Sequence, residues 1–253
     1  MATTNKVYFI AGGNRGIGLS LVKELSSREG TTVFASARKP EAATELQEWS
    51  KSHPNVKTVE LDVTSQQSAN EAAQSVAKAV DGIDVLWLNS GICQSYYTVM
   101  EAPEEVWNAH YQTNVLGPIH VFKAFYPLLT KKKTRQVIFT SSECGSMGDF
   151  RATGFSAYGQ SKAAINFTMK ELSVELADEH FTFISIHPGV VKTDMNADAI
   201  KKFTETSPEM LTYLKKVTII PEESVSSMLK VVDNLKPENN GSFYRYDGTI
   251  IPF

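Results

Sequence analysis

Short apolar runs rich in β-branched residues alternate along the chain with longer stretches in which apolar residues recur every three or four positions. The first pattern predicts buried strands, and the second predicts helices that cover them. Seven strands are expected, at residues 7–11, 31–37, 56–62, 83–89, 135–142, 181–189 and 241–248. Helices are expected between them, at about 16–29, 40–52, 65–81, 103–131, 156–180 and 221–235.

An alternation of strands and helices of this length predicts parallel crossovers, and therefore an α/β fold of the doubly wound, Rossmann type. We expect a mostly parallel seven-stranded sheet with helices on both faces. The chain has 253 residues, of which 42% are hydrophobic. That is enough to bury a core within a single domain spanning 1–253. In such a sheet a ligand lies beyond the carboxyl ends of the strands.

Charge and composition argue against several other classes of protein. The net charge of -3 gives no electrostatic reason to expect nucleic acid or an anionic membrane as partner. No apolar run reaches the ~20 residues needed to span a bilayer, and the N-terminus lacks the pattern of a secretory signal. The two cysteines, Cys93 and Cys144, and the five histidines show no metal-binding spacing. We therefore expect a cytoplasmic protein without a metal site.

Tyr158 lies four residues before Lys162, within the expected helix 156–180. Helical spacing places both side chains on one face. A neighbouring cation favours the phenolate and lowers the pKa of a tyrosine, so the pair would form a general acid suited to neutral pH. The same spacing is also typical of a solvated helix surface, and the pair gains weight only from the motifs that precede it.

A glycine-rich turn follows the first expected strand, in the sequence AGGNRGIG from Ala11 to Gly18. Its glycines permit positive φ and close approach of the backbone, and the helix that follows presents free amides to a pyrophosphate. The spacing is G-x-x-x-G-x-G and differs from the G-x-G-x-x-G dinucleotide fingerprint. The turn predicts a dinucleotide cradle, although a glycine turn alone is often only a turn.

Together these segments resemble the short-chain dehydrogenase/reductase family. Its members carry a glycine loop at the N-terminus and a Y-x-x-x-K pair about two thirds of the way along the chain. Further family motifs follow in order, at Leu61-Asp62-Val63, Asn89-Ser90-Gly91, Asn114, Ser142 and Pro188-Gly189. The resemblance covers essentially the whole chain, and the ordered series of motifs argues against coincidence.

The chain departs from the family pattern at three places. Ala11 and Ser90 replace the usual Thr and Ala, and because both are small we expect the loop geometry to survive. Ser142 lies further before the Y-x-x-x-K pair than is common in the family, which leaves Ser141 as a competing candidate. Ser142 is preferred because Gly145 follows it, as in the family's S-x-x-G.

The resemblance implies an oxidoreductase with a dinucleotide cofactor. The second expected strand ends at Arg38 without the acidic residue that an NAD site uses for the ribose 2'-hydroxyl. Arg38 and Arg15 instead supply fork donors suited to a 2'-phosphate, so NADP(H) is expected. The residues assigned to the cofactor are Gly12, Asn14, Arg15, Gly16, Ile17, Gly18, Arg38, Asp62, Val63, Asn89, Ser90, Gly91, Tyr158, Lys162, Pro188, Gly189, Val191 and Thr193.

The resemblance also implies roles for four catalytic residues. Tyr158 would protonate the substrate carbonyl, while Lys162 would lower the pKa of Tyr158 and bind the nicotinamide ribose. Ser142 would donate a hydrogen bond to the developing alkoxide. Asn114 would bend a helix and hold a water that links Lys162 to solvent. For Asn114 and Thr193, a local backbone cap is the alternative role.

Loops next to these motifs supply an expected apolar wall for the substrate, at Cys93, Tyr96, Tyr97, Cys144, Met147, Phe150 and Phe155. In the family, the segment that corresponds to 192–220 forms a mobile cover over the substrate; a solvated helix pair without closing motion is the alternative. Sites lined by aromatic residues and Met favour apolar ligands. The expected reaction is therefore reduction of an apolar or aromatic ketone, diketone or quinone-like carbonyl to the alcohol. Arg151 would favour an anionic substrate if it pointed inward, but such an Arg more often faces solvent.

Two other functions remain open. A protein that senses NADP(H) without turnover would keep the glycine loop, but it would not need the Asn, Ser, Tyr and Lys set. A sugar-nucleotide epimerase or dehydratase also uses Tyr and Lys, but it usually needs a larger carboxyl-terminal domain. Family members often pair through the helices that correspond to 103–131 and 156–180, so a homodimer or homotetramer is one expectation and a monomer the other.

Overall fold

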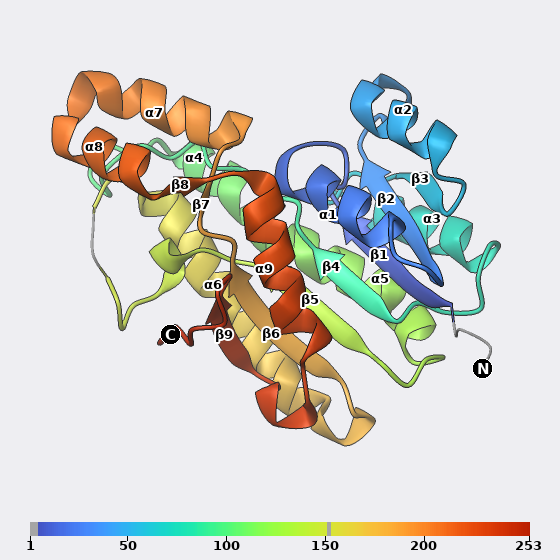
Figure 1. Ribbon diagram of the computed structural model, residues 1–253. Coiled ribbons are helices and arrows are strands. Elements are labelled where there is room, and N and C mark those ends of the chain that lie inside the picture. Colours follow the sequence, from blue (N-terminus) through green and yellow to red (C-terminus); the bar gives the residue numbers. More distant parts are fainter. Residues whose placement is uncertain (1–4, 151–152) are drawn as a thin grey trace.

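A computed structural model describes residues 5–150 and 153–253 (Figure 1). Its centre is a seven-stranded sheet in the order β3-β2-β1-β4-β5-β6-β9, in which every neighbouring pair is parallel. The strands are β1 (Lys6–Ala11), β2 (Thr31–Ala37), β3 (Val56–Glu60), β4 (Val85–Leu88), β5 (Gln136–Thr140), β6 (Thr182–His187) and β9 (Ser242–Arg245). The seven expected strands and the doubly wound α/β class are confirmed. Arg151 lies outside the described residues.

Helices cover both faces of this sheet (Figure 1). One face packs against α1 (Gly16–Ser26), α2 (Thr44–Ser52) and α9 (Pro221–Asp233). The other face packs against α3 (Gln66–Ala77), α5 (Gly117–Leu129) and α6 (Ser156–Glu175), and α4 (Glu104–His110) leads into α5. Short 3₁₀ turns lie at Pro40–Ala42, Glu143–Gly145, Ala177–Glu179 and Pro237–Asn239. No helix in the described ranges is long and apolar enough to cross a membrane.

β1 shows why the strands appear in the sequence as continuous apolar runs. Successive side chains of a strand point to opposite faces of the sheet. Val7, Phe9 and Ala11 enter the core beside α3 and α5, whereas Tyr8 and Ile10 enter the core beside α1 and α9. Both faces of a parallel sheet are covered by helices, so every position of the strand must be apolar.

The expected helix 103–131 is interrupted near its middle. Pro103 precedes α4, a π-helical turn follows at Tyr111–Leu116, and Gly117 begins α5. Asn114 lies within the π-helical turn and is buried. Single π-helical turns inside α-helices occur frequently at functional sites. The bend that the family resemblance implied at Asn114 therefore takes the form of this widened turn.

The segment 192–220 forms two helices, α7 (Asp194–Thr206) and α8 (Pro208–Val217). They lie together at the end of the molecule away from α2, and the start of α7 approaches the start of α1 (Figure 1). A small second sheet joins them to the rest, because β7 (Val190–Val191) pairs in parallel with β8 (Thr218–Ile219). No strand was expected between 192 and 220, so β8 is a correction to the seven strands predicted from the sequence. Ala199, Phe203 and Leu214 form a separate apolar cluster between the helices and their surroundings.

The packing of α5 on the sheet gives a direct test of the fold. Phe125 is fully buried, and its ring lies 4.1 Å from that of Phe9 in β1. We expect Phe125→Ala to lower the free energy of unfolding by about 3–5 kcal/mol, because a large cavity would remain. Phe150→Ala is the matched control, since that side chain is 67% exposed. Denaturant unfolding of both variants is the measurement, and equal losses would contradict the packing described.

Candidate active site

Tyr158 and Lys162 lie on the face of α6 that looks toward the carboxyl ends of β4 and β5. Lys162 is 5% exposed, and its Nζ donates to the carbonyl oxygen of Thr140 at the end of β5, at 2.8 Å. The same Nζ lies 5.7 Å from the centre of the Tyr158 ring. Burial lowers the pKa of Lys162 to about 8. The two side chains therefore share one face, with Lys162 buried and Tyr158 half-buried, and the lysine keeps its charge at neutral pH.

The pKa of Tyr158 moves opposite to the sequence-based expectation. Burial raises it well above its usual value, the neighbouring Cys93 and Cys144 raise it further, and a hydrogen bond with Ser142 lowers it. The expected lowering by Lys162 was therefore wrong for this structure, because the loss of solvent around the phenol outweighs a cation whose own charge burial also disfavours. Tyr158 is consequently a protonated phenol at neutral pH, and it can donate a proton.

The two candidate serines at the end of β5 have different surroundings. The Ser142 side chain lies close enough to the Tyr158 hydroxyl to lower its pKa. Ser142 Oγ also accepts from the backbone amide of Cys144 at 3.2 Å. Ser141 Oγ is buried and finds no partner among residues 5–150 and 153–253. Its backbone amide donates to Ile186 in β6, at 2.8 Å. Ser142 is thus the serine that reaches the phenol.

Asn114 joins three segments that are distant in sequence. Its Oδ1 accepts from the backbone amide of Ile92 at 2.8 Å, and its Nδ2 donates to the carbonyl of Ile92 at 2.9 Å and to Ser161 Oγ at 3.0 Å. A Cβ placed on Gly91 would lie 3.3 Å from Asn114 Oδ1 and 3.5 Å from Lys162 Nζ. Asn114 therefore cross-links the loop after β4 to α6, and it does not act as a local cap.

The glycine turn has the geometry of a phosphate cradle. Gly12 and Gly16 have φ values of 79° and 54°, which glycine adopts without strain. A Cβ on Gly18 would overlap the carbonyl oxygen of Gly12. Arg15, the residue that precedes α1, makes no side-chain cap bond to the helix. The first amides of α1 are therefore available to an anion, and the residues present fit a dinucleotide pyrophosphate.

Two side chains from neighbouring strands hold the glycine turn in place. Ser36 Oγ in β2 accepts from the amide of Gly12 at 3.0 Å, and Asn89 Nδ2 donates to the carbonyl of Gly12 at 3.0 Å. Ser90 also lies against Gly12, since a Cβ there would be 2.6 Å from Ser90 Oγ. These contacts hold the turn although Ala11 lacks the hydroxyl of the usual Thr at this position. Sequence reasoning missed Ser36, whose only signal was a lone hydroxyl in an apolar strand.

The two arginines assigned to the 2'-phosphate have different neighbours. Arg38 is exposed at the end of β2, and its charge is one cause of the lowered pKa of Asp62, after the hydrogen bonds from Thr64. Arg15 Nη1 lies 3.1 Å from Asp194 Oδ2, and both side chains are exposed. Arg38 therefore shares the adenosine end of the sheet with Asp62, whereas Arg15 links the glycine turn to the start of α7.

The turn after β6 approaches the glycine turn from the other side. Gly189 follows the buried Pro188 with a φ of 84°. A Cβ on Gly16 would lie 3.2 Å from the Thr193 side chain. Thr193 also caps α7, because its Oγ1 accepts from the amide of Asn196 at 3.4 Å. The remaining assigned residues lie in the glycine turn and α1 or at strand ends around it, namely Asn14, Ile17, Val63 and Val191.

Only part of the expected substrate wall gathers around Tyr158. Cys93 and Cys144 lie close enough to influence its pKa, and the centre of the Phe155 ring lies 6.4 Å from that of Tyr158. Burial raises the pKa of both cysteine thiols, to about 12 for Cys93. Two expected residues do not join this group, because their side chains are 79% and 67% exposed: Met147 and Phe150. The Tyr97 backbone instead accepts from the amide of Ser156 at 3.3 Å.

A ring from α7 completes this wall. The ring centre of Phe203 lies 5.5 Å from that of Phe155 and 5.9 Å from that of Tyr96, and Tyr96 and Phe155 are 6.1 Å apart. Tyr96 also donates from its hydroxyl to the carbonyl of Met195 at 3.3 Å. Sequence reasoning missed Phe203, although Ala199 and Phe203 stand four residues apart on one helix face. The three rings form an apolar corner between the loop after β4, α6 and α7.

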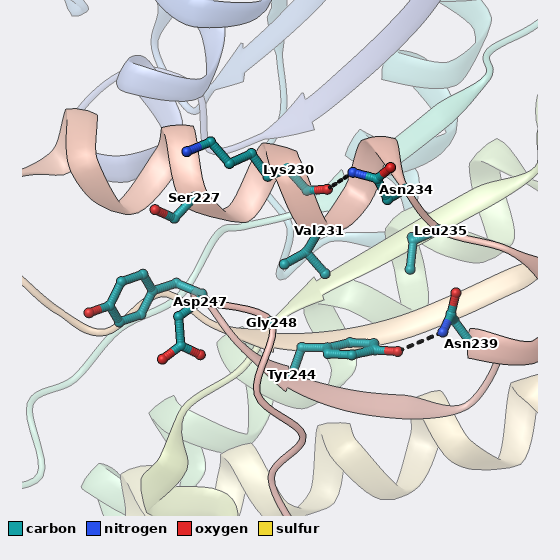
Figure 2. A pocket seen from close by; sticks show the side chains of 10 residues that line it. Ser227, Lys230, Val231, Asn234, Leu235, Asn239, Tyr244, Asp247 and Gly248 are labelled. Atoms are coloured by element: carbon teal, nitrogen blue, oxygen red, sulfur yellow. Dashed lines mark hydrogen bonds between the residues drawn. The ribbon is translucent and has the colours of Figure 1, made fainter.

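A groove of about 490 Å³ lies elsewhere, between α9 and the segment around β9 (Figure 2). Asn239 Nδ2 donates to the hydroxyl of Tyr244 at 2.9 Å, and Asn234 Nδ2 donates to the carbonyl of Lys230 at 2.7 Å, as Figure 2 shows. These amides already have partners within the protein. The groove shares no residue with the set around Tyr158, so it is separate from the candidate active site.

Comparison with known proteins agrees with this arrangement. Residues 6–203 match the family model described as short chain dehydrogenase. An uncharacterized oxidoreductase of Schizosaccharomyces pombe is 66% identical over 253 residues, which cover 100% of both chains. The NADPH-bound carbonyl reductase from chicken fatty liver superposes with a TM-score of 0.88 at 30% identity, over 99% of this chain and 95% of that one. Carbonyl reductase Sniffer of D. melanogaster superposes with a TM-score of 0.87 at 29% identity, over 99% of this chain and 100% of that one. A half-buried Tyr and a buried Lys on one helix, a braced glycine turn and these matches lead to one conclusion: the chain is an oxidoreductase of the short-chain dehydrogenase/reductase family.

Proposed function

We propose that this chain reduces small apolar or aromatic carbonyl compounds to alcohols with NADPH. The observation that carries the proposal is the protonated Tyr158 phenol, half-buried within reach of Ser142 and beside the charged Lys162. A proton donor, a second hydroxyl and a nearby cation are what a carbonyl oxygen needs as it gains negative charge. The match to short-chain dehydrogenases and the likeness to carbonyl reductases support the same chemistry.

Each residue of this group has a separate role in the proposal. Ser142 donates to the carbonyl oxygen and orients it, and Tyr158 transfers its proton to that oxygen. Lys162 stabilises the phenolate left behind and holds the ribose of the cofactor next to the nicotinamide. When bound, NADPH supplies the hydride. Asn114 keeps the loop after β4 at a fixed distance from α6, so the substrate enters a space of constant width.

The cofactor is NADP(H). The glycine turn fits a pyrophosphate, and the end of β2 carries the exposed Arg38 and no acidic side chain that would hydrogen-bond a free 2'-hydroxyl. The charge of Arg38 already acts on Asp62, the residue assigned to the adenine. The chicken carbonyl reductase, 30% identical to this chain, has NADPH bound.

The apolar corner of Tyr96, Phe155 and Phe203 supports the substrate class. Aromatic rings with few polar contacts favour ligands that are themselves apolar. Because Phe203 belongs to α7, the segment 192–220 contributes directly to the substrate site, and we propose that it closes over bound substrate. After Pro188 the described chain adds three α-helices, a small strand pair and β9, less than the separate substrate domain that a sugar-nucleotide epimerase usually needs.

We also propose that the chain forms a homodimer through α5 and α6. A groove of about 410 Å³ between these helices is lined by apolar side chains such as Ile119 and Leu172 together with charged ones such as Glu171. Phe167 is exposed on α6. A cytoplasmic location stays a prediction, supported by the two free cysteines, since disulfides are rare in that compartment.

Steady-state NADPH oxidation across matched neutral, anionic and polyhydroxylated carbonyls tests the proposed reaction. We expect the highest kcat/KM for neutral aromatic or apolar ketones, diketones or quinones. A clear preference for carboxylated or sugar-like carbonyls would contradict the substrate class, and NADPH binding without any turnover would favour a sensing protein.

Replacement of the proposed acid gives the sharpest mutational test. We expect Tyr158→Phe to keep NADPH affinity and to lower kcat by ~10² or more, the value of a positioned general acid. Fluorescence titration of NADPH and turnover of the best substrate are the two measurements. Substantial retained turnover would remove Tyr158 from this role.

Cofactor preference depends on Arg38. Wild type is expected to favour NADPH over NADH, and Arg38→Ala is expected to lose about one to two decades of that preference, because a charge-assisted bond to phosphate contributes about 1.5–3 kcal/mol. Lys39→Ala, the exposed neighbour, is the matched control. The measurement is kcat/KM with NADPH and with NADH for wild type and both variants. Equal use of NADH by wild type would contradict the assignment of Arg38 to the 2'-phosphate.

The lowered pKa of Lys162 predicts a pH dependence of cofactor binding. Lys162 is charged below about pH 8 and loses its proton above that value. We expect NADPH affinity to fall about tenfold or more as pH rises from 7 to 9.5, since hydrogen bonds from a charged donor are lost. Lys162→Ala should bind weakly at every pH and lack this change. The same slope in both proteins would assign the effect to another group.

A further inference from the structure

His110, the last residue of α4, is 1% exposed and lies four residues before Asn114. Its Nδ1 lies 2.7 Å from the carbonyl oxygen of Val106, and its Nε2 lies 3.1 Å from the backbone amide of Gln94. A carbonyl only accepts and an amide only donates, so Nδ1 must carry the proton and Nε2 must accept. The two partners therefore require a neutral imidazole in one tautomer.

Gln94 belongs to the loop that caps the helix of Tyr158. The residue that precedes α6, Phe155, makes no side-chain cap bond. The missing bonds come from the loop after β4: the buried Ser95 accepts from the amide of Ala157 at 3.1 Å, and the Tyr97 carbonyl accepts from the amide of Ser156 at 3.3 Å. The first turn of α6 is thus held by residues directly after the one that His110 binds.

His110 also contacts Tyr158 directly. The two rings meet edge to face, with their centres 6.4 Å apart and their planes at 77°. An edge-to-face contact limits the directions in which the phenol can tilt. His110 therefore acts on Tyr158 by two routes, through the ring contact and through the cap of α6.

We propose that neutral His110 is a positioning residue that fixes the Tyr158 hydroxyl and the loop at Gln94–Tyr97 for carbonyl reduction. This rests on the proposed function for its catalytic consequence. The bond to Gln94 and the bonds of Asn114 to Ile92 clamp the same loop at two points one turn apart. Asn114 fixes the side of the loop that faces Lys162, and His110 fixes the side that carries Tyr96 and the apolar corner.

Protonation of His110 would break its hydrogen bond with the Gln94 amide. An imidazolium carries N–H on both nitrogens, so Nε2 would face the Gln94 amide donor to donor. Burial lowers the pKa of His110, the Val106 carbonyl raises it and the charge of Lys162 lowers it. Tyr158 on α6 faces the His110 ring and Cys93 precedes Gln94 in the loop, and neither group carries a charge at acidic pH. The clamp is therefore intact at neutral pH and opens as pH falls below the usual histidine range.

The test compares two substitutions. His110→Phe keeps the ring against Tyr158 and removes both hydrogen bonds, whereas His110→Gln keeps an acceptor for Gln94 and cannot titrate. We expect His110→Phe to lower kcat about tenfold and raise KM for the ketone, with NADPH affinity unchanged. We expect His110→Gln to recover most of kcat and to lose the acidic limb of the kcat/KM profile. His53→Gln, at the end of α2, should keep that limb.

Amide hydrogen exchange of Ser156 and Ala157 gives a readout that does not need turnover. His110→Phe should exchange these amides about tenfold faster than wild type, and His110→Gln should restore their protection. Unchanged exchange, or an acidic limb that persists in His110→Gln, would overturn the proposal. The proposal would also be overturned if His110→Phe lowered NADPH affinity and melting temperature together, because His110 would then have only a structural role. If wild type reduces no carbonyl, the proposed function fails, and the exchange result still decides the role of His110.

Discussion

The pair of hydrogen bonds between Asn114 and the backbone of Ile92 is the contact on which the rest of the site depends. It ties a widened helical turn to the loop after β4, and the third bond from Asn114 reaches Ser161 on α6. A side-chain amide can satisfy both the backbone N–H and the backbone C=O of one residue, because it offers a donor and an acceptor in one plane. The carboxyl end of β4 and the helix that carries Tyr158 are thereby held at one separation.

Burial decides the electrostatics of the site. A phenol and an ammonium at helical spacing suggest a tyrosine with a lowered pKa, yet the structure removes Lys162 and much of Tyr158 from water. Desolvation disfavours each charged form, so Tyr158 retains its proton more firmly and Lys162 holds its proton less firmly. The proton donor is therefore protonated at neutral pH, as an ordinary tyrosine also is, and the raised pKa by itself makes Tyr158 a weaker acid. The phenolate is disfavoured until Tyr158 transfers its proton to the carbonyl oxygen.

The strands could be read from the sequence because a sheet covered on both faces demands uninterrupted apolar runs, as in Val7–Ala11. The cofactor turn could be read because only glycine fits positions such as Gly12 and Gly18. Contacts between distant segments could not be read in this way. Nothing local distinguishes Ser36, which braces Gly12, from a serine that merely fits a strand. Phe203 reaches the apolar corner only through the path of α7, and the exposure of Met147 and Phe150 depends on how their loop leaves Ser142.

The two thiols beside Tyr158 have a consequence for the choice of substrate. The thiolate, and not the thiol, attacks electrophilic carbon, and burial keeps both Cys93 and Cys144 protonated at neutral pH. Quinones and unsaturated ketones alkylate ordinary surface cysteines. Beside Tyr158 the two sulfur atoms therefore act as polarizable apolar packing, and neutral thiols there would resist alkylation by an electrophilic carbonyl compound.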